Sequence, residues 1–223
     1  MKIRNPYSLF VFVISLLATI TFSVEQSRAA SLLVSNNNDS GPGSLRQAIQ
    51  DNLNLGGGNA ILFSNTVTGT ITLASQLNIS ASVTIVGPGA SVLKVSGNNS
   101  RRVLNITGGP VSIFDLTISD GRILGTNGLV AAKGENVLGG GIANLNSANL
   151  TLTGCVISNN AALGGQGGPS NGGGGNGFGG GIYNEGILTL NQCALDGNTA
   201  QGGSGGGASG MGGEGWGGGF YGG

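Results

Sequence analysis

The hexapeptide Gly-Gly-Gly-Ile-Ala-Asn at residues 139–144 is followed by two altered copies of itself. It returns as Gly-Gly-Gly-Ile-Tyr-Asn at residues 179–184 and as Gly-Gly-Gly-Phe-Tyr-Gly at residues 217–222. Repetition at a spacing of about 40 residues is typical of solenoids and related arrays, in which each unit packs mainly on its neighbours. The repeat therefore decides the fold class.

A second repeated segment lies behind the first two copies. Leu-Thr-Leu-Thr-Gly-Cys at residues 150–155 matches Leu-Thr-Leu-Asn-Gln-Cys at residues 188–193. Without its glycine run, one unit keeps about 24 residues and three short alternating segments, enough for one turn of a three-sided parallel β-helix. Residues 111–116 fit the same frame, which predicts that Leu116, Cys155 and Cys193 stack in one interior row.

The chain from residue 60 to residue 119 predicts further short strands. Apolar and polar side chains alternate over three to five residues at a time, and turns rich in glycine, asparagine and serine separate these segments. Such strands suit either a sandwich or a solenoid, and the repeat favours an all-β solenoid. The segments include residues 70–73, 77–79, 83–85, 93–95, 111–113 and 116–118.

Residues 31–59 predict a cap made of a short strand at 32–34 and one helix. Ser44 is a good N-cap, and Gln47 stands three residues later, as a capping box requires. Three glycines at residues 56–58 end the helix. We expect the apolar face of the helix to cover one end of the core, and this face consists of Leu45, Ala48, Ile49 and Leu53.

The first thirty residues have the pattern of an export signal. Lys2 and Arg4 precede an apolar run at residues 9–22, and Ser-Arg-Ala at residues 27–29 offers a cleavage site. An uncleaved anchor is the alternative, but the run is short for a membrane span, which needs roughly 20 residues. We therefore predict a signal peptide over residues 1–30, a cap over 31–59 and β-helix repeats over 60–223, with no membrane span after cleavage.

Glycine makes up 47 of the 223 residues, and 28 of these glycines lie from residue 164 onward. The tracts at residues 164–178 and 202–215 contain few apolar side chains to offset the entropy of ordering the chain. They predict long, mobile side loops on one flank of the solenoid. Two alternatives are polyproline-II-like bundles and a flexible spacer, although the periodic Leu-Thr-Leu segments argue against the spacer.

The composition excludes several kinds of activity. Histidine is absent, which removes His-based triads and His-metal sites. Charged residues are only 8% of the chain and the formal net charge is zero, which argues against a nucleic-acid surface. Asp115, Asp120 and Arg122 form the one cluster that suggests chemistry, and we interpret it as an ion pair in a turn. We predict no catalytic, cofactor-binding or metal-binding residues.

The two cysteines and four asparagines repeat in matching positions. Neighbouring turns would bring Cys155 and Cys193 within range of a disulfide, but stacked side chains point the same way, so we expect free, buried thiols. Asn144 matches Asn184, and Asn160 matches Asn198. These pairs predict hydrogen-bonded asparagine ladders in preference to a ligand-binding row.

Three further side-chain groups are surface candidates. Arg101 and Arg102 form a small basic spot, which we expect to be solvated. Phe220 stands where Ile142 stands in the first repeat, so we expect it to pack in the core. Trp216 lies inside a glycine tract and is the aromatic residue best placed to bind a ligand.

The chain also resembles a known group of proteins. Leu-Val-Ser-Asn-Asn-Asn-Asp-Ser-Gly-Pro-Gly-Ser-Leu-Arg-Gln-Ala-Ile at residues 33–49 is similar to the opening of exported bacterial β-helix proteins of the pectin-lyase-like fold. The Gly-Gly-Gly-Ile-Tyr-Asn repeat resembles those of polymorphic outer-membrane and adhesin-like proteins. Residues 83–99, with Gly-Pro-Gly-Ala at 87–90, are also typical of this group. The resemblance implies a right-handed coil and secretion or surface display.

These observations lead to one functional expectation and one alternative. We expect a non-enzymatic, exported or cell-surface protein that displays loops toward a polysaccharide, a host surface or the envelope. The alternative is a carbohydrate-active enzyme of the polysaccharide-lyase type on the same fold. The third repeat begins at residue 217 without its following strands, so we expect a truncated or longer chain, or self-association through an uncapped C-terminal edge.

Overall fold

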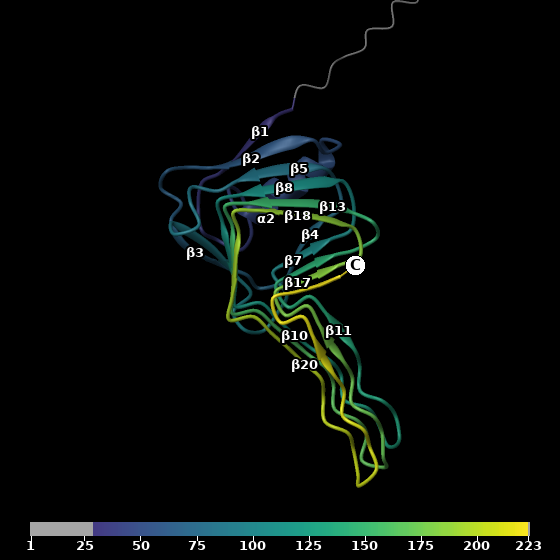
Figure 1. Ribbon diagram of the computed structural model, residues 1–223. Coiled ribbons are helices and arrows are strands. Elements are labelled where there is room, and N and C mark those ends of the chain that lie inside the picture. The colour runs from purple at the N-terminus through teal and green to yellow at the C-terminus, as the bar shows by residue number, and fades with distance from the viewer. Residues whose placement is uncertain (1–28, 223) are drawn as a thin grey trace, which may run out of the picture.

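The computed structural model describes residues 29–222 and consists of stacked parallel β-strands with a single α-helix. The strands form a compact body, and a narrow projection extends from one side of it (Figure 1). The expected export signal at residues 1–30 lies almost wholly outside the described residues. Within them, the backbone N–H of Ala30 donates a hydrogen bond to the side chain of Asn59 over 2.8 Å, so the described chain is tied to the body from its start.

Three parallel sheets make up the body. Sheet A contains β1 (Ser31–Val34), β2 (Asn59–Phe63), β5 (Val83–Val86), β8 (Pro110–Phe114), β13 (Asn149–Thr153) and β18 (Ile187–Asn191). Sheet B contains β3 (Gly69–Thr72), β6 (Leu93–Ser96), β9 (Thr117–Ser119), β14 (Val156–Ser158) and β19 (Ala194–Asp196). Sheet C contains β4 (Leu77–Ile79), β7 (Leu104–Ile106), β12 (Ile142–Asn144), β17 (Ile182–Asn184) and β22 (Phe220–Gly222).

The chain visits these sheets in a fixed order, and each strand pairs in parallel with the corresponding strand of the turn before. The two repeated hexapeptides provide one such pair, because Ile142 lies opposite Ile182 and Asn144 opposite Asn184. The same register joins β13 to β18, with Leu150 opposite Leu188. The prediction of an all-β fold built from stacked repeats is confirmed, and the arrangement is consistent with a parallel β-helix.

Alternation along each strand sends every second side chain inward, and in-register stacking turns these side chains into interior rows. One row of sheet A contains Ile61, Ile85, Ile113 and Leu152, all at most 2% exposed. Each such residue stabilises the fold by roughly 1.5–3 kcal/mol relative to an exposed position. The predicted row of Leu116, Cys155 and Cys193 also forms, since these residues directly precede the paired strands β9, β14 and β19.

The helix α2 (Leu45–Asn54) contacts β1, β2 and β4 and so covers one end of the core. Ser44 is the N-cap, and its hydroxyl accepts a hydrogen bond from the N–H of Gln47 over 3.1 Å. The predicted buried face is wrong at one position, because Leu53 is 44% exposed whereas Asn52 is 2% exposed. The Asn52 side chain accepts hydrogen bonds from Asn59 and donates one to the backbone of Ser82, which satisfies its polar atoms in the interior.

The projection, which we call the fin, consists of three out-and-back excursions at residues 122–138, 161–178 and 199–216. Two further parallel sheets lie at its base. Sheet D contains β10 (Arg122–Leu124), β15 (Ala161–Leu163) and β20 (Thr199–Gln201). Sheet E contains β11 (Val137–Leu138), β16 (Gly177–Phe178) and β21 (Gly215–Trp216).

Backbone hydrogen bonds join all six legs of the fin beyond these sheets. The N–H of Glu135 donates to the carbonyl of Thr126, that of Gly165 to Glu135, and that of Gly175 to Gly165. The series continues from Gly203 to Gly175, and it ends with the bond from Gly213 to Gly203. The chain of bonds alternates between outgoing and returning legs. The glycine tracts leave the body on one side, as expected, but the alternative of a packed bundle describes their hydrogen-bonded legs better than the expected long, mobile loops.

Glycine is required where these legs approach most closely. A Cβ at Gly165 would overlap the carbonyl oxygen of Thr126, and one at Gly175 would overlap that of Glu135. The same close approach recurs three residues further from the body, at Gly168 on the outgoing leg and at Gly172 on the returning leg. Three residues per turn is the spacing of a polyproline-II-type helix. Backbone packing therefore replaces the hydrophobic core in this part of the molecule.

Candidate functional site

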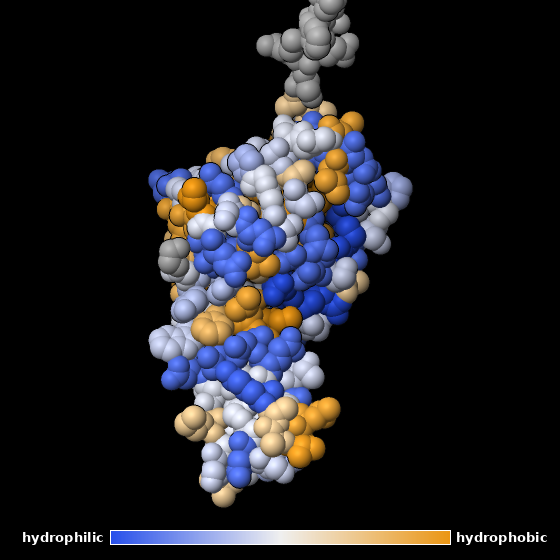
Figure 2. Space-filling model, turned by 90° about the vertical axis from the view of Figure 1, so that its right-hand side faces the viewer, coloured by the Kyte–Doolittle hydropathy of each residue, from blue (hydrophilic) through white to orange (hydrophobic). Residues whose placement is uncertain are grey.

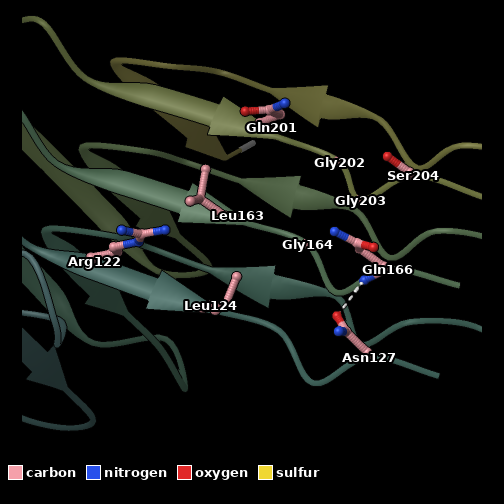
Figure 3. A pocket seen from close by; sticks show the side chains of 10 residues that line it. All are labelled: Arg122, Leu124, Asn127, Leu163, Gly164, Gln166, Gln201, Gly202, Gly203 and Ser204. Carbon is pink, nitrogen blue, oxygen red and sulfur yellow. Dashed lines mark hydrogen bonds between the residues drawn. The ribbon is translucent and has the colours of Figure 1, made fainter. Parts of the chain in front are cut away.

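A hollow of about 300 Å³ lies on one face of the fin, close to the body (Figure 3). Its side chains come from the three outgoing legs, one above another. Gln166, Gln201 and Ser204 supply uncharged polar groups, and Arg122 supplies the only charge in the lining. The full lining comprises Arg122, Leu124, Asn127, Leu163, Gly164, Gln166, Gln201, Gly202, Gly203 and Ser204.

Two periodicities bring these side chains to one face. In sheet D, alternate residues point outward, so Leu124 stands in register with Leu163 and with Gln201. Beyond the sheet, glycines take the inner positions of the three-residue repeat and leave the outer positions to Asn127, Gln166 and Ser204. Each strand thus continues into a glycine segment, and together they present the apolar side chains of Leu124 and Leu163 beside polar side chains on one surface.

Arg122 does not form the predicted ion pair. Asp120 instead pairs with Lys94, whose Nζ lies 3.4 Å from Oδ2, and it accepts further hydrogen bonds from Ser96 and Ser119. The guanidinium of Arg122 has no hydrogen-bond or ion-pair partner among residues 29–222 and points along the hollow (Figure 3). The expectation failed because Asp120 has a left-handed backbone, with φ of 51°, and its side chain reaches across to the previous turn of sheet B.

Only one of the three side-chain amides that line the hollow forms a hydrogen bond within the fin. Oδ1 of Asn127 accepts a hydrogen bond from the backbone N–H of Gln166 over 2.9 Å, which links two layers. The side-chain amides of Gln166 and Gln201 and the hydroxyl of Ser204 have no partner within the described part of the chain, and all three residues are exposed. The hollow therefore offers donors, acceptors and one cation to an incoming polar molecule.

This arrangement is chemically suited to binding. Leu124 and Leu163 can contact the apolar face of a ring or chain, while the amides can bond to hydroxyl groups and the guanidinium to an anionic group. Elsewhere in residues 29–222, no three cysteine or acidic side chains gather closely enough to hold a metal ion.

Comparison of the chain with protein-family models, with curated proteins and with solved structures gives no match. Among residues 29–222, no helix has both the length and the apolar character needed to cross a membrane.

The predicted asparagine ladders are present. Nδ2 of Asn144 donates to Oδ1 of Asn184 over 2.6 Å, and Nδ2 of Asn160 donates to Oδ1 of Asn198 over 2.9 Å. Asn144 and Asn160 are fully buried, and their amides also donate to the backbone carbonyls of Ala148 and Ile118. These residues satisfy the turns of the stack and are not part of a binding surface.

The basic spot at Arg101 and Arg102 is not a solvated pair. Arg102 is partly buried where the fin meets sheet C, and burial lowers the pKa of its guanidinium. It donates to the carbonyl oxygens of Leu138 and Gly139 at 2.6 and 2.8 Å. The expectation is wrong for Arg102, which attaches the returning leg of the first fin layer to the body.

Three aromatic rings, from sheets C and E, gather where the fin joins the body. The rings of Tyr183 and Tyr221 are stacked with centroids 5.9 Å apart, and Phe178 lies 5.1 Å from Tyr221. Trp216 is 45% exposed, as its role as a binding candidate requires. Phe220 lies opposite Ile182 and so occupies the expected row. It is 41% exposed, however, so the expectation that it packs in the core is wrong.

Both cysteines are free thiols, as expected. Cys155 is buried, but the expectation of burial is wrong for Cys193, which is only partly buried because it lies in the last turn of its row. Gln166, Gln201 and Ser204 were not among the site residues predicted from the sequence. Their signal is nevertheless visible in the sequence, because they are isolated polar residues within or beside glycine tracts. When the repeats are aligned, Gln166 and Ser204 occupy equivalent positions, whereas Gln201 aligns with Leu163.

Proposed function

We propose that this chain is a non-enzymatic, exported or cell-surface β-helix protein whose fin contacts a surface polysaccharide. The observation that carries the proposal is the unpartnered guanidinium of Arg122 in a hollow with the free amides of Gln166 and Gln201. Sugar hydroxyls match amide donors and acceptors, and a carboxylate or sulfate on the sugar matches the guanidinium.

The wider assignment rests on the resemblance to exported bacterial β-helix proteins of the pectin-lyase-like fold, including polymorphic outer-membrane and adhesin-like proteins. We propose the right-handed coil of that group, since parallel crossover connections are right-handed in about 98% of cases. The body then acts as a rigid support, and the hydrogen-bonded fin presents the hollow at a fixed distance from it.

Binding of the full chain to immobilised polysaccharides tests this proposal. Carboxylated polymers such as polygalacturonate and alginate should be retained, and Arg122→Ala should weaken their binding at least tenfold, which is about 1.4 kcal/mol. Arg101→Ala is the matched control, because the guanidinium of Arg101 bonds only to the hydroxyl of its neighbour Ser100 among residues 29–222, and the backbone bonds of Arg101 do not depend on its side chain. Binding unchanged in Arg122→Ala would contradict the proposal, and calcium-dependent release of unsaturated sugar would favour the lyase alternative.

A second partner is another copy of the chain. Strands β18 and β22 form the outer edges of sheets A and C among the described strands. Leu190 and Phe220 are 38% and 41% exposed there, whereas Leu152 and Ile182 in the same rows are fully buried one turn earlier. An exposed parallel edge can pair with a further strand. Concentration-dependent growth in mass by light scattering, abolished by Leu190→Lys, is the expected result; a constant monomer mass would refute self-association.

A further inference from the structure

Each excursion of the fin forms one layer, and backbone hydrogen bonds join each layer to the next in a repeated pattern. The N–H of Gly128 in the first layer donates to the carbonyl of Gln166 in the second over 2.7 Å. The N–H of Gly167 in the second layer donates to the carbonyl of Ser204 in the third over 2.8 Å. The same pattern is formed by two further pairs of donors, Gly125 with Gly164 and Gly134 with Gly174.

In the third layer, which is yellow in Figure 1, the corresponding N–H groups have no partner. These groups belong to Gly202, Gly205 and Gly212. None of the three donates a hydrogen bond within residues 29–222. The carbonyl of Gly213 likewise accepts none there, whereas that of its counterpart Gly175 accepts a bond from Gly203 over 2.8 Å. An edge of unpaired N–H and C=O groups is a template for a further chain.

Gly212 is a glycine that the described structure does not require. Its counterparts Gly134 and Gly174 lie against the next layer, and a Cβ on them would overlap the carbonyl oxygens of Gly165 and Gly203. At Gly212 the nearest atom to a Cβ is 3.7 Å away, and the backbone is not left-handed. The position thus keeps the residue type that a covering layer needs, although the described part of the chain contains no such layer.

Side chains close the opposite face of the fin. Gly165 and Gly168 of the second layer must be glycine, because a Cβ would overlap the carbonyl oxygens of Thr126 and Val130 in the first. The first layer itself carries Thr126 and Leu129 at these two positions. Both residues are exposed, and apolar surface is visible near the far end of the fin in Figure 2. These side chains prevent an equally close approach, so the residue types favour addition on the third layer.

The polar side chains of the third layer line the flanks of the fin. Ser204 lines the hollow on the outgoing legs (Figure 3), and Met211 and Glu214 line a second hollow, of about 340 Å³, on the returning legs. Glu214 also continues a column of acceptors. Oδ1 of Asn136 accepts the N–H of Asn176 over 2.7 Å, and Oδ1 of Asn176 accepts that of Glu214 over 3.0 Å. The carboxylate of Glu214 is therefore an acceptor at the position that a next layer would reach.

We propose that the outer face of the third layer binds a glycine-rich segment of another protein, which adds as a fourth layer in the polyproline-II conformation. Two equivalent faces within the fin identify this occupant, since each holds an extended chain with glycines three residues apart. These glycines are Gly165 and Gly168 on the first layer and Gly203 and Gly206 on the second. The site consists of fin backbone, so the proposal does not depend on polysaccharide binding or on self-association through β18 and β22.

NMR titration of the full chain with a peptide of residues 199–216 tests this proposal. The peptide has the sequence of the layer that packs on the equivalent face of the second layer. Its addition should shift the amide signals of Gly202, Gly205 and Gly212 in a saturable way and slow their hydrogen exchange. A peptide with alanine in place of Gly203 and Gly206 should not bind, because these two Cβ atoms would overlap carbonyl oxygens of the layer beneath.

The variant Gly212→Ala should block the face without disturbing the fold. Its new Cβ has 3.7 Å of clearance, so the melting temperature should be unchanged, whereas peptide binding should weaken roughly tenfold or more. Gly173→Ala is the matched control, because Gly173 has the same clearance but lines the hollow on the flank. Arg122→Ala should also leave peptide binding unchanged while it weakens polysaccharide binding.

Three results would overturn the proposal: unshifted amide signals of the third layer, equal binding of the alanine-containing peptide, or undiminished binding to the folded Gly212→Ala variant. A dimer that Gly212→Ala abolishes, formed by a chain that binds no peptide, would assign the face to a second copy and so also overturn the proposed partner.

Discussion

The side-chain amide of Asn144 donates a hydrogen bond to Oδ1 of Asn184 over 2.6 Å, although one whole repeat separates the two residues. The same amide bonds to the carbonyl of Ala148 at 3.0 Å, and Asn184 in turn donates to Gly186 at 2.7 Å. The ladder therefore satisfies turn carbonyls in the interior and at the same time fixes the register between two turns. Repetition in the sequence is thus converted into a direct contact between repeats.

Replacement of Asn144 by alanine should destabilise the protein by about 1–3 kcal/mol, because it leaves buried carbonyl groups without a donor. Asn191→Ala is the control, since its amide makes only a long, exposed contact of 3.5 Å with Thr153. Chemical denaturation of the two variants measures the difference. An equal loss in both variants would mean that the buried ladder contributes no more than a surface contact.

Two glycines of the same layer should respond differently to alanine. Gly165 lies against the carbonyl of Thr126, whereas the nearest atom to a Cβ at Gly173 is 3.7 Å away, on Met211. Gly165→Ala should therefore separate the legs of the fin and speed amide hydrogen exchange there, and Gly173→Ala should leave exchange unchanged. Fast exchange of the fin amides in the wild-type chain would contradict the hydrogen-bonded arrangement.

The fold could be predicted from sequence because its signals are local and repeated. Alternating segments located most of the strands, and the repeat placed Leu116 above Cys155. The helix was also found, but its buried face was not. Leu53 is apolar and has helical spacing, yet Asn52 occupies the interior position. Asn59, at the start of the next strand, and Ser82, 30 residues away, provide its hydrogen-bond partners. Such a choice depends on tertiary contacts that no local pattern contains.

In the fin, by contrast, the local sequence predicts less order than the structure has. Ordering a residue costs roughly 1–2 kcal/mol, and one hydrogen bond returns only about 1 kcal/mol, so a glycine tract alone predicts disorder. Regularity across three layers changes this balance, because legs from different repeats satisfy each other. Residues such as Gly165 and Gly203 become informative only when the repeats are aligned and the three-residue spacing is read across them.

The ion pair between Asp39 and Arg46 gives the protein a dependence on acid pH. Burial tends to raise the pKa of Asp39, but the hydrogen bond and charge of Arg46, 2.7 Å away, hold this pKa below its usual value. A lowered pKa in the folded state stabilises the fold above the unfolded value of about 3.9, and the contribution is lost as the pH falls through the folded value.

Asp39→Asn should therefore cost about 1 kcal/mol at pH 7, as expected for a half-buried pair. The difference from the wild-type chain should shrink toward zero as the pH is lowered below 4. Unfolding curves collected from pH 7 down to pH 2.5 provide the measurement. A difference that stays constant over this range would show that the carboxylate charge is not the source of the effect.

The thiol of Cys155 should not react with thiol reagents in the folded protein. Burial, reinforced by the neighbouring Cys193, raises its pKa to about 11, so very little thiolate exists at pH 8. Its Sγ also lies 3.5 Å from the carbonyls of Ile113 and Thr153. In the Cys193→Ser variant, where Cys155 is the single thiol, a disulfide-exchange reagent at pH 8 should react only after denaturant is added. Rapid reaction of the native variant would mean that the interior row around Cys155 opens to solvent. If the wild-type chain showed no reactive thiol even in denaturant, the two cysteines would instead be joined by a disulfide.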